Sequence, residues 1–217
     1  MALVNAALFP DTRTVETTRG VKMGRVVVTE FVSVDGVMQA PGDPGEYERG
    51  GWARGGGQAG NQFKFDELMA SDAQLLGRVT YEGFARAWPS MEGTGVFGEK
   101  MNAMPKFVAS TTLHDPGWEN TSVLDGDLGA AVTSLKDRYD GDILIAGSAQ
   151  LVQSLLELDL VDELRLMVFP VVLGKGTRLF GETSAVKPLE LVDATPLEDG
   201  VFVLTYRSGA DRNSDEH

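Results

Sequence analysis

Two short segments of the sequence combine a glycine with groups that can bind a phosphate. In the first segment, an apolar pair at 75–76 is followed by Gly77, Arg78 and, two residues later, Thr80. A strand that turns into a helix through a glycine presents unpaired backbone amides, which bind anions. Arg78 would add a charge-assisted contact and Thr80 a hydroxyl. The alternative is a tight turn at Gly77 with Arg78 in solvent, and a single glycine turn does not exclude it.

The second segment repeats this arrangement further along the chain. The apolar run 142–146 is followed by Gly147, and Ser148 stands where a helix would begin. Gly147 would let a pyrophosphate approach the backbone while the start of the helix offers amides. Ser148 is also a natural N-cap, so the alternative is that it caps its own helix and contacts no ligand. The predicted cofactor-binding residues here are Gly147, Ser148, Ala149, Gln150 and Leu151.

A third cluster of donors stands at the end of the predicted strand 106–110, where Ser110 is followed by Thr111. Ligands of open α/β sheets bind at the carboxyl ends of the strands. Three donor clusters at three strand ends therefore predict a dinucleotide cleft at one edge of the sheet. The three clusters together are a more specific signal for such a cleft than any one of them alone.

Three further positions are candidates for contact with a substrate. Asp35 follows the first predicted strand and could orient substrate or relay a proton, or serve only as a turn residue. Trp52 lies in the glycine-rich stretch 40–60 and could stack on a planar substrate or anchor the loop. Lys175, with Arg178 nearby, could bind an anionic substrate or belong to an ordinary hairpin connection.

Composition narrows the classes of function. The 217 residues include 19 basic and 32 acidic side chains, for a formal charge of −13, which repels nucleic acid and anionic lipid. The chain has no cysteine, which excludes disulfides and thiol catalysis. With only two histidines, we expect no metal site. Without a long apolar run or a secretory signal, we expect a cytoplasmic protein that contacts neither membrane nor nucleic acid.

The pattern of the remaining sequence predicts an α/β fold. Apolar, β-branched runs indicate strands, and apolar residues at helical spacing indicate helices. Strands are expected at 25–32, 73–76, 106–110, 121–124, 142–146, 163–173 and 201–207, and helices at 61–70, 80–87, 127–139 and 148–160. We expect a largely parallel sheet covered by helices on both faces, with the last two strands paired antiparallel. Residues 1–22 are expected to be a flexible extension, 23–208 the domain, and 209–217 a flexible tail.

Several of these segments resemble a known family. The segment GRVTYEGF is similar to the G-R-x-T-[WY]-E motif of dihydrofolate reductases. The segments FVSVDG, LLGRVTYE, KFVAST, ILIAGSAQL and VFPVVLGKGTRLF resemble the reductase domain of riboflavin biosynthesis, the C-terminal domain of bacterial RibD, over Arg25 to about Arg207. The resemblance implies a three-layer dihydrofolate-reductase-like sandwich and the cofactor NADPH. It places Arg78 and Ser110 or Thr111 at the 2′-phosphate, and Thr80 and the Gly147 turn at the pyrophosphate.

The departures from that family restrict the expected reaction. Folate reductases usually carry a carboxylate at a position that here falls near Asn61, although Asp66 and Glu67 lie further along. They also tend to have two glycines where this chain has Ala146-Gly147, and no zinc-deaminase half is present. We therefore expect a stand-alone, NADPH-dependent reductase of a small, planar, pterin- or pyrimidine-like heterocycle. The alternatives are a riboflavin-pathway 5-amino-6-ribosylaminopyrimidine reductase, with a phosphate pocket near Lys175 and Arg178, and a non-catalytic nucleotide-binding protein. The sequence also allows a homodimer.

Overall fold

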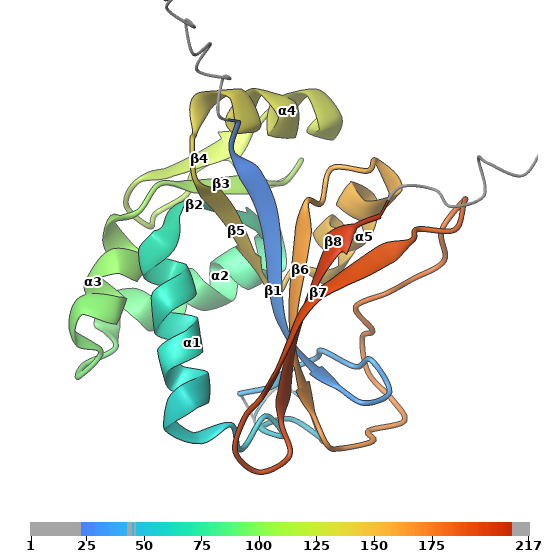
Figure 1. Cartoon of the computed structure of the whole chain (residues 1–217). Coiled ribbons are helices and arrows are strands. Elements are labelled where there is room, and N and C mark those ends of the chain that lie inside the picture. Colours follow the sequence, from blue (N-terminus) through green and yellow to red (C-terminus); the bar gives the residue numbers. More distant parts are fainter. Residues whose placement is uncertain (1–22, 43–44, 46, 210–217) are drawn as a thin grey trace, which may run out of the picture.

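The computed structural model describes residues 23–42, 45 and 47–209, which form an eight-stranded sheet with helices on both faces (Figure 1). The expected flexible segment 1–22 and the tail beyond residue 209 lie outside the described residues. The strands are β1 (Arg25–Ser33), β2 (Ser71–Gly77), β3 (Lys106–Ala109), β4 (Thr121–Leu124), β5 (Asp142–Ala146), β6 (Glu163–Phe169), β7 (Leu189–Pro196) and β8 (Phe202–Ser208). The helices are α1 (Gly57–Ala70), α2 (Arg78–Ala87), α3 (Gly95–Ala103), α4 (Leu128–Arg138) and α5 (Ala149–Glu157), with a 3-10 turn, η1 (Trp88–Ser90).

The strands run in the order β4-β3-β2-β5-β1-β6-β8-β7. The first six are mutually parallel, and β8 is antiparallel to both β6 and β7. Strand β1 is central because its valines are apolar on both faces, so that Val27 lies beside Leu144 of β5 while Val28 lies beside Leu164 of β6. The predicted parallel sheet and the predicted antiparallel pairing of the last long strands are both confirmed.

Helices cover the sheet in two layers. Helices α4 and α5 pack Val132, Leu135 and Leu155 onto one face, together with Val26 and Val28 of β1. Helices α1, α2 and α3 cover the other face, where the buried residues are mostly Leu, Met and aromatic. The result is the predicted three-layer α/β/α sandwich, and all six parallel strands point their carboxyl ends at one edge. No helix in the described part of the chain combines the length and apolarity that crossing a membrane requires.

Four elements differ clearly from the sequence-based expectations. Helix α1 begins at Gly57 rather than Asn61, and β6 ends at Phe169 because Pro170 follows it and cannot donate to the ladder. Helix α3 was not predicted, since three glycines at 93, 95 and 98 obscure its pattern. Strand β7 was missed because it is exposed along most of its length and so lacks the alternation that marks a half-buried strand.

Lys106 at the start of β3 is fully buried and holds three segments together. Its Nζ donates hydrogen bonds to the backbone carbonyls of Asn102, Met104 and Glu119 at 2.6, 2.9 and 3.1 Å. The ammonium also lies over the Trp118 ring, 4.3 Å from the centroid. Burial lowers the pKa of Lys106 to about 8. This clamp fixes β3 against α3 and the loop that leads into β4.

Candidate nucleotide-binding site

A pocket of about 810 Å³ lies at the carboxyl ends of β2, β3, β4 and β5. This edge is where the sequence placed its three donor clusters. The predicted residues that line the pocket are Gly77, Arg78, Thr80, Ser110, Thr111, Ser148, Ala149, Gln150 and Leu151. Gly147 does not line it but directly precedes Ser148. The structure therefore brings the predicted cofactor residues together around one cavity of the size that binds small ligands.

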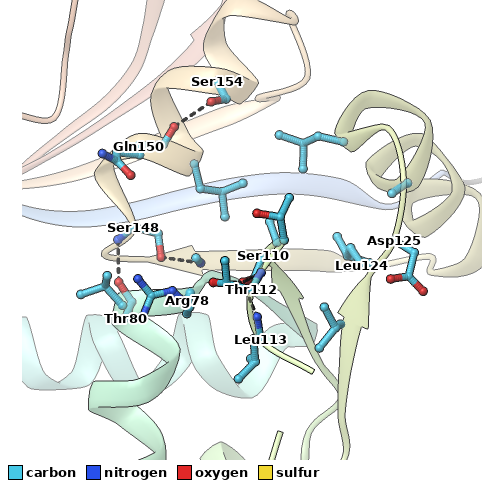
Figure 2. Close-up of a pocket in the computed structure, with 18 of the residues that line it drawn as sticks. Arg78, Thr80, Ser110, Thr112, Leu113, Leu124, Asp125, Ser148, Gln150 and Ser154 are labelled. Atoms are coloured by element: carbon cyan, nitrogen blue, oxygen red, sulfur yellow. Dashed lines mark hydrogen bonds between the residues drawn. The ribbon is translucent and has the colours of Figure 1, made fainter. Parts of the chain in front are cut away.

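The two glycine turns are joined to each other by hydrogen bonds across the pocket wall. The backbone N–H of Gly77 donates to Ser148 Oγ at 2.9 Å, and the N–H of Ser148 donates to Thr80 Oγ1 at 2.9 Å (Figure 2). Ser148 stands at the N-cap of α5, but its side chain makes no hydrogen bond to that helix. The alternative interpretation, in which Ser148 caps its own helix, is not met, because its hydroxyl accepts from the neighbouring turn instead.

The backbone of the second turn is left-handed at two consecutive residues, with φ of +70° at Gly147 and +64° at Ser148. A Cβ added at Gly147 would lie 3.0 Å from both Cγ2 and Oγ1 of Thr80. The need for glycine here comes from this close approach of Thr80 as well as from the positive φ. Ser148 carries a Cβ in the same unfavourable region, so its two hydrogen bonds must hold the turn in place.

Arg78 lies on the pocket at the start of α2, and its guanidinium is paired within its own helix. Its Nη1 donates to both carboxylate oxygens of Glu82, at 2.9 and 3.1 Å, in an exposed ion pair. Exposed pairs of this kind contribute little to stability, so a phosphate can replace Glu82 as the partner of Arg78. In Figure 2, Arg78, Thr80 and Ser148 gather on the same side of the pocket.

Ser110 is also engaged, in the loop that follows β3. Its Oγ accepts hydrogen bonds from the backbone N–H groups of Thr112 and Leu113 at 3.1 and 3.0 Å. Its hydroxyl proton remains able to donate. Ser110 thus orders the loop that carries Thr111 and Thr112 into the pocket.

Sequence reasoning missed the remaining wall of the pocket. This wall comes from the loop after β3, the end of β4 and the start of α4, with one residue from the loop after β6. Its members include Thr112, His114, Leu124, Asp125, Gly126, Leu128 and Thr177. The parallel pairing of β4 with β3 would have pointed to Asp125 and Gly126, because it brings the carboxyl end of β4 to the same edge.

Asp35 lies outside the pocket lining and is held as an acceptor. Its carboxylate accepts from Ser33 Oγ at 2.7 Å and from the backbone N–H groups of Leu173 and Gly174 at 3.0 and 2.8 Å. These hydrogen bonds, that of Ser33 first, lower the pKa of Asp35 to about 2. An acid with this pKa is ionised at neutral pH and has no proton to give, so the structure supports the turn-residue reading of Asp35.

Trp52 and Lys175 also lie outside the pocket lining. The Trp52 indole N–H donates to the carbonyl of Gln39 at 2.9 Å, and its ring packs edge-on against Phe169 at 5.7 Å. These contacts are those of a loop anchor. Lys175 is exposed, and its backbone carbonyl accepts from the Tyr47 hydroxyl at 2.7 Å.

Arg178, the second cation of the Lys175 loop, is committed to Asp35. Its guanidinium donates to the backbone carbonyl of Asp35 and lies 3.6 Å from the Asp35 carboxylate. The Arg178 side chain is 48% exposed, so a substrate phosphate would have to compete with Asp35 for its charge. The loop that carries both cations is therefore tied back to the turn after β1.

Two buried carboxyl groups near the end of β1 were not predicted from the sequence as site residues. Glu67 on α1 accepts from Thr29 Oγ1 at 2.8 Å and pairs with Lys64 at 2.5 Å. Glu30 on β1 is buried close to the Gly147 turn. Asn61, at the position where folate reductases usually carry a carboxylate, is exposed. Within the described residues, no group of three or more His, Cys, Asp or Glu side chains could hold a metal ion.

The sheet order, the helical layers and the pocket at the strand ends define a dihydrofolate-reductase-like α/β protein. The chain belongs to the RibD C-terminal domain family, which it matches over residues 25–203. It is 28% identical over 192 residues to the uncharacterized protein YyaP of Bacillus subtilis strain 168, covering 87% of this chain and 97% of YyaP.

Solved structures share this fold at lower identity. A putative riboflavin biosynthesis protein from Shewanella sp. PV-4 superposes with a TM-score of 0.62 at 21% identity, covering 85% of this chain and 99% of that one. Dihydrofolate reductase from Enterococcus faecalis, in complex with NADP(H) and RAB-propyl, superposes with a TM-score of 0.52 at 18% identity, covering 86% of this chain and 98% of that one. The resemblance noted in the sequence motifs is thus confirmed for family and fold.

Proposed function

We propose that the protein is an NADPH-dependent reductase of a small, planar heterocycle of the pterin or pyrimidine type. The observation that carries the proposal is the pocket where the starts of α2 and α5 meet, with Arg78 and a set of hydroxyls around it. Membership of a family named for a riboflavin-biosynthesis domain supports reductase chemistry. NADPH would supply the hydride, while the protein supplies binding and orientation.

The residues around the pocket suit the anionic half of this cofactor. Arg78 and Ser110 or Thr111 would hold the 2′-phosphate, and Thr80 with the Gly147 turn would face the pyrophosphate. Arg78 would exchange Glu82 for the phosphate, which is a stronger, doubly charged partner. Because the chain as a whole is acidic, with a charge of −13, local donors must overcome the repulsion of the whole molecule. The protein should therefore bind NADPH with strong salt dependence.

The second part of the proposal is the planar heterocycle that accepts the hydride. A phosphorylated pyrimidine would need cations at the Lys175 loop, where Lys175 is exposed and Arg178 lies 3.6 Å from the Asp35 carboxylate. The riboflavin-pathway sugar phosphate therefore stays the alternative substrate. The Trp52 indole packs edge-on against Phe169, which favours its role as a loop anchor over stacking on the substrate.

Binding and turnover of reduced nicotinamides test the proposal. Calorimetry should show tighter binding of NADPH than of NADH, and absorbance should show NADPH oxidation with at least one dihydropterin or aminopyrimidine. NADPH oxidation with quinones alone would contradict the proposed heterocycle. Tight NADPH binding without turnover of any of these classes would favour the non-catalytic nucleotide-binding alternative. Equal affinity for NADPH and NADH would contradict the assignment of Arg78, and binding of neither would reject the proposal.

A further inference from the structure

Glu30 is a buried carboxyl on β1, the strand at the centre of the sheet. The residue is 5% exposed, and strand alternation places it on the same face as Val28 and Val32, which pack in the core with α5. Its Oε1 has no hydrogen-bond partner in the described part of the chain. A carboxyl in such a place lowers stability relative to an apolar side chain, so packing alone does not account for it.

In the parallel pairing of β1 with β5, Thr29 lies opposite Ala146, so the next residues along, Glu30 and Gly147, are neighbours at the end of the pair. The Gly147 backbone amide is the hydrogen-bonding group that acts on the Glu30 carboxyl. Burial raises the pKa of Glu30 well above its ordinary value, and the hydrogen bond from Gly147 offsets part of this rise. The charged groups that act on Glu30 are Lys64, which lowers its pKa, and Glu67, which raises it. These two are paired with each other at 2.5 Å, and Arg165 of β6 lies 3.9 Å from Glu67. The Gly147 amide is therefore the contact that gives Glu30 a direct link to the pocket.

A continuous set of contacts leads from Glu30 to the pocket wall. Glu30 contacts the N–H of Gly147, and the next residue, Ser148, accepts from Gly77 and donates to Thr80. Both residues of this turn are left-handed, which for Ser148 costs about 1–2 kcal/mol relative to the usual regions. Removing the contact at Gly147 would free the end of the turn that faces the core.

We propose that Glu30 is a positioning residue of the nucleotide pocket: its carboxyl holds the Gly147 amide from the core side and fixes the turn that joins the pocket walls. The ligand side of this inference rests on the proposed function, whereas the effect on the turn does not. Glutamine keeps an acceptor for the Gly147 N–H, and leucine removes it. A neutral group at this position also repels a bound pyrophosphate less than a carboxylate does.

Glu30→Gln and Glu30→Leu separate positioning from packing. Without ligand, amide hydrogen exchange of residues 147–151 should stay close to wild type in Glu30→Gln and become at least about ten-fold faster in Glu30→Leu, as expected for a lost hydrogen bond. NADPH affinity should fall about ten-fold in Glu30→Leu and be retained in Glu30→Gln.

Gln74→Leu is the matched control. Gln74 is a buried polar residue on β2 whose Oε1 also lacks a hydrogen-bond partner in the described residues, and its Nε2 contacts Met101 Sδ at 2.9 Å. Its replacement should alter neither exchange of residues 147–151 nor NADPH affinity. If it alters them as much as Glu30→Leu does, the effect is general to the core and the proposal fails.

Two further outcomes would overturn the role of Glu30. The first is wild-type exchange of residues 147–151 in Glu30→Leu, and the second is an equal loss in Glu30→Gln and Glu30→Leu. If Glu30→Leu does not fold, Glu30→Ala, which also removes the acceptor, takes its place, and wild-type exchange of residues 147–151 in that variant would reject the proposal. Absence of NADPH binding in the wild type would reject the proposed function instead, and the exchange data would still decide the role of Glu30.

Discussion

Replacing Gly147 with valine tests the geometry of the turn most directly. The substitution adds a β-branched side chain at a φ of +70°, where its Cβ would lie 3.0 Å from Thr80 Cγ2 and Oγ1. The first obstacle to this side chain is thus Thr80, before any ligand is considered. Thr80 must turn away and give up the hydrogen bond that it accepts from Ser148.

The expected loss of stability in Gly147→Val is the sum of two contributions. A Cβ in the left-handed region costs about 1–2 kcal/mol. The lost hydrogen bond at Thr80 adds about 1 kcal/mol, for a total of about 2–3 kcal/mol. In a chain of this size, about 1 kcal/mol corresponds to about 2–4 °C in melting temperature, so Gly147→Val should melt about 4–12 °C below wild type.

Gly93→Val is the matched control outside the pocket. Gly93 has a φ of +74°, but a Cβ added there meets no atom within 4 Å, and the residue does not line the pocket. It should therefore suffer only the backbone cost and lose about 2–8 °C. Scanning calorimetry with and without NADPH should show a normal upshift by the cofactor in Gly93→Val and none in Gly147→Val. Equal melting temperatures and equal upshifts in the two variants would contradict the proposed geometry of the Gly147 turn.

Three other substitutions test separate parts of the structure. Arg78→Ala should lower the affinity for NADPH about ten- to a hundred-fold by calorimetry and leave the affinity for NADH almost unchanged. Glu82→Gln should not lower the affinity for NADPH. An equal effect of Arg78→Ala on both cofactors would argue against a 2′-phosphate contact. Lys106→Met leaves three carbonyls without their donor and should lower the free energy of unfolding in urea by about 3 kcal/mol, and a loss below about 1 kcal/mol would contradict the clamp. The pKa of Asp35 is lowered from 3.8 to about 2, so its contribution to stability is present above pH 3.8 and is lost as the pH falls toward 2. In wild type, the melting temperature should therefore fall as the pH is lowered from 3.8 to about 2, and Asp35→Asn should make this fall smaller. An unchanged fall in Asp35→Asn would show that Asp35 is not its source.

The sequence predicted best those features that depend on neighbouring residues. Strands 121–124 and 142–146 have the expected bounds because apolar runs end there at turn residues. Exposed β7 gave no such signal, and helix α3 was hidden by its glycines. The edge of the sheet that carries the pocket followed from the strand ends alone.

The contacts that define the roles of single residues could not be predicted in the same way. Ser148 accepts from Gly77, which is 71 positions away, so the sequence could not decide between helix capping and a role in the pocket. Asp35 reaches the Leu173 and Gly174 amides across 138 and 139 positions, which fixes its charge state. Glu30 stands inside an apolar strand pattern, and only the fold brings the Gly147 amide to it. Each of these contacts depends on how distant strands are paired.

The hydrogen bonds that join the Gly77 and Gly147 turns have a consequence for the kinetics of binding. These hydrogen bonds hold both turns by contacts within the chain itself, so we expect a ligand to find the turns already ordered. The only change that phosphate binding demands at this wall is the rotation of Arg78 away from Glu82, and exposed side chains rotate within nanoseconds. Stopped-flow association should therefore show a single phase whose rate rises linearly with NADPH concentration, without the plateau that a slow opening of the pocket would impose.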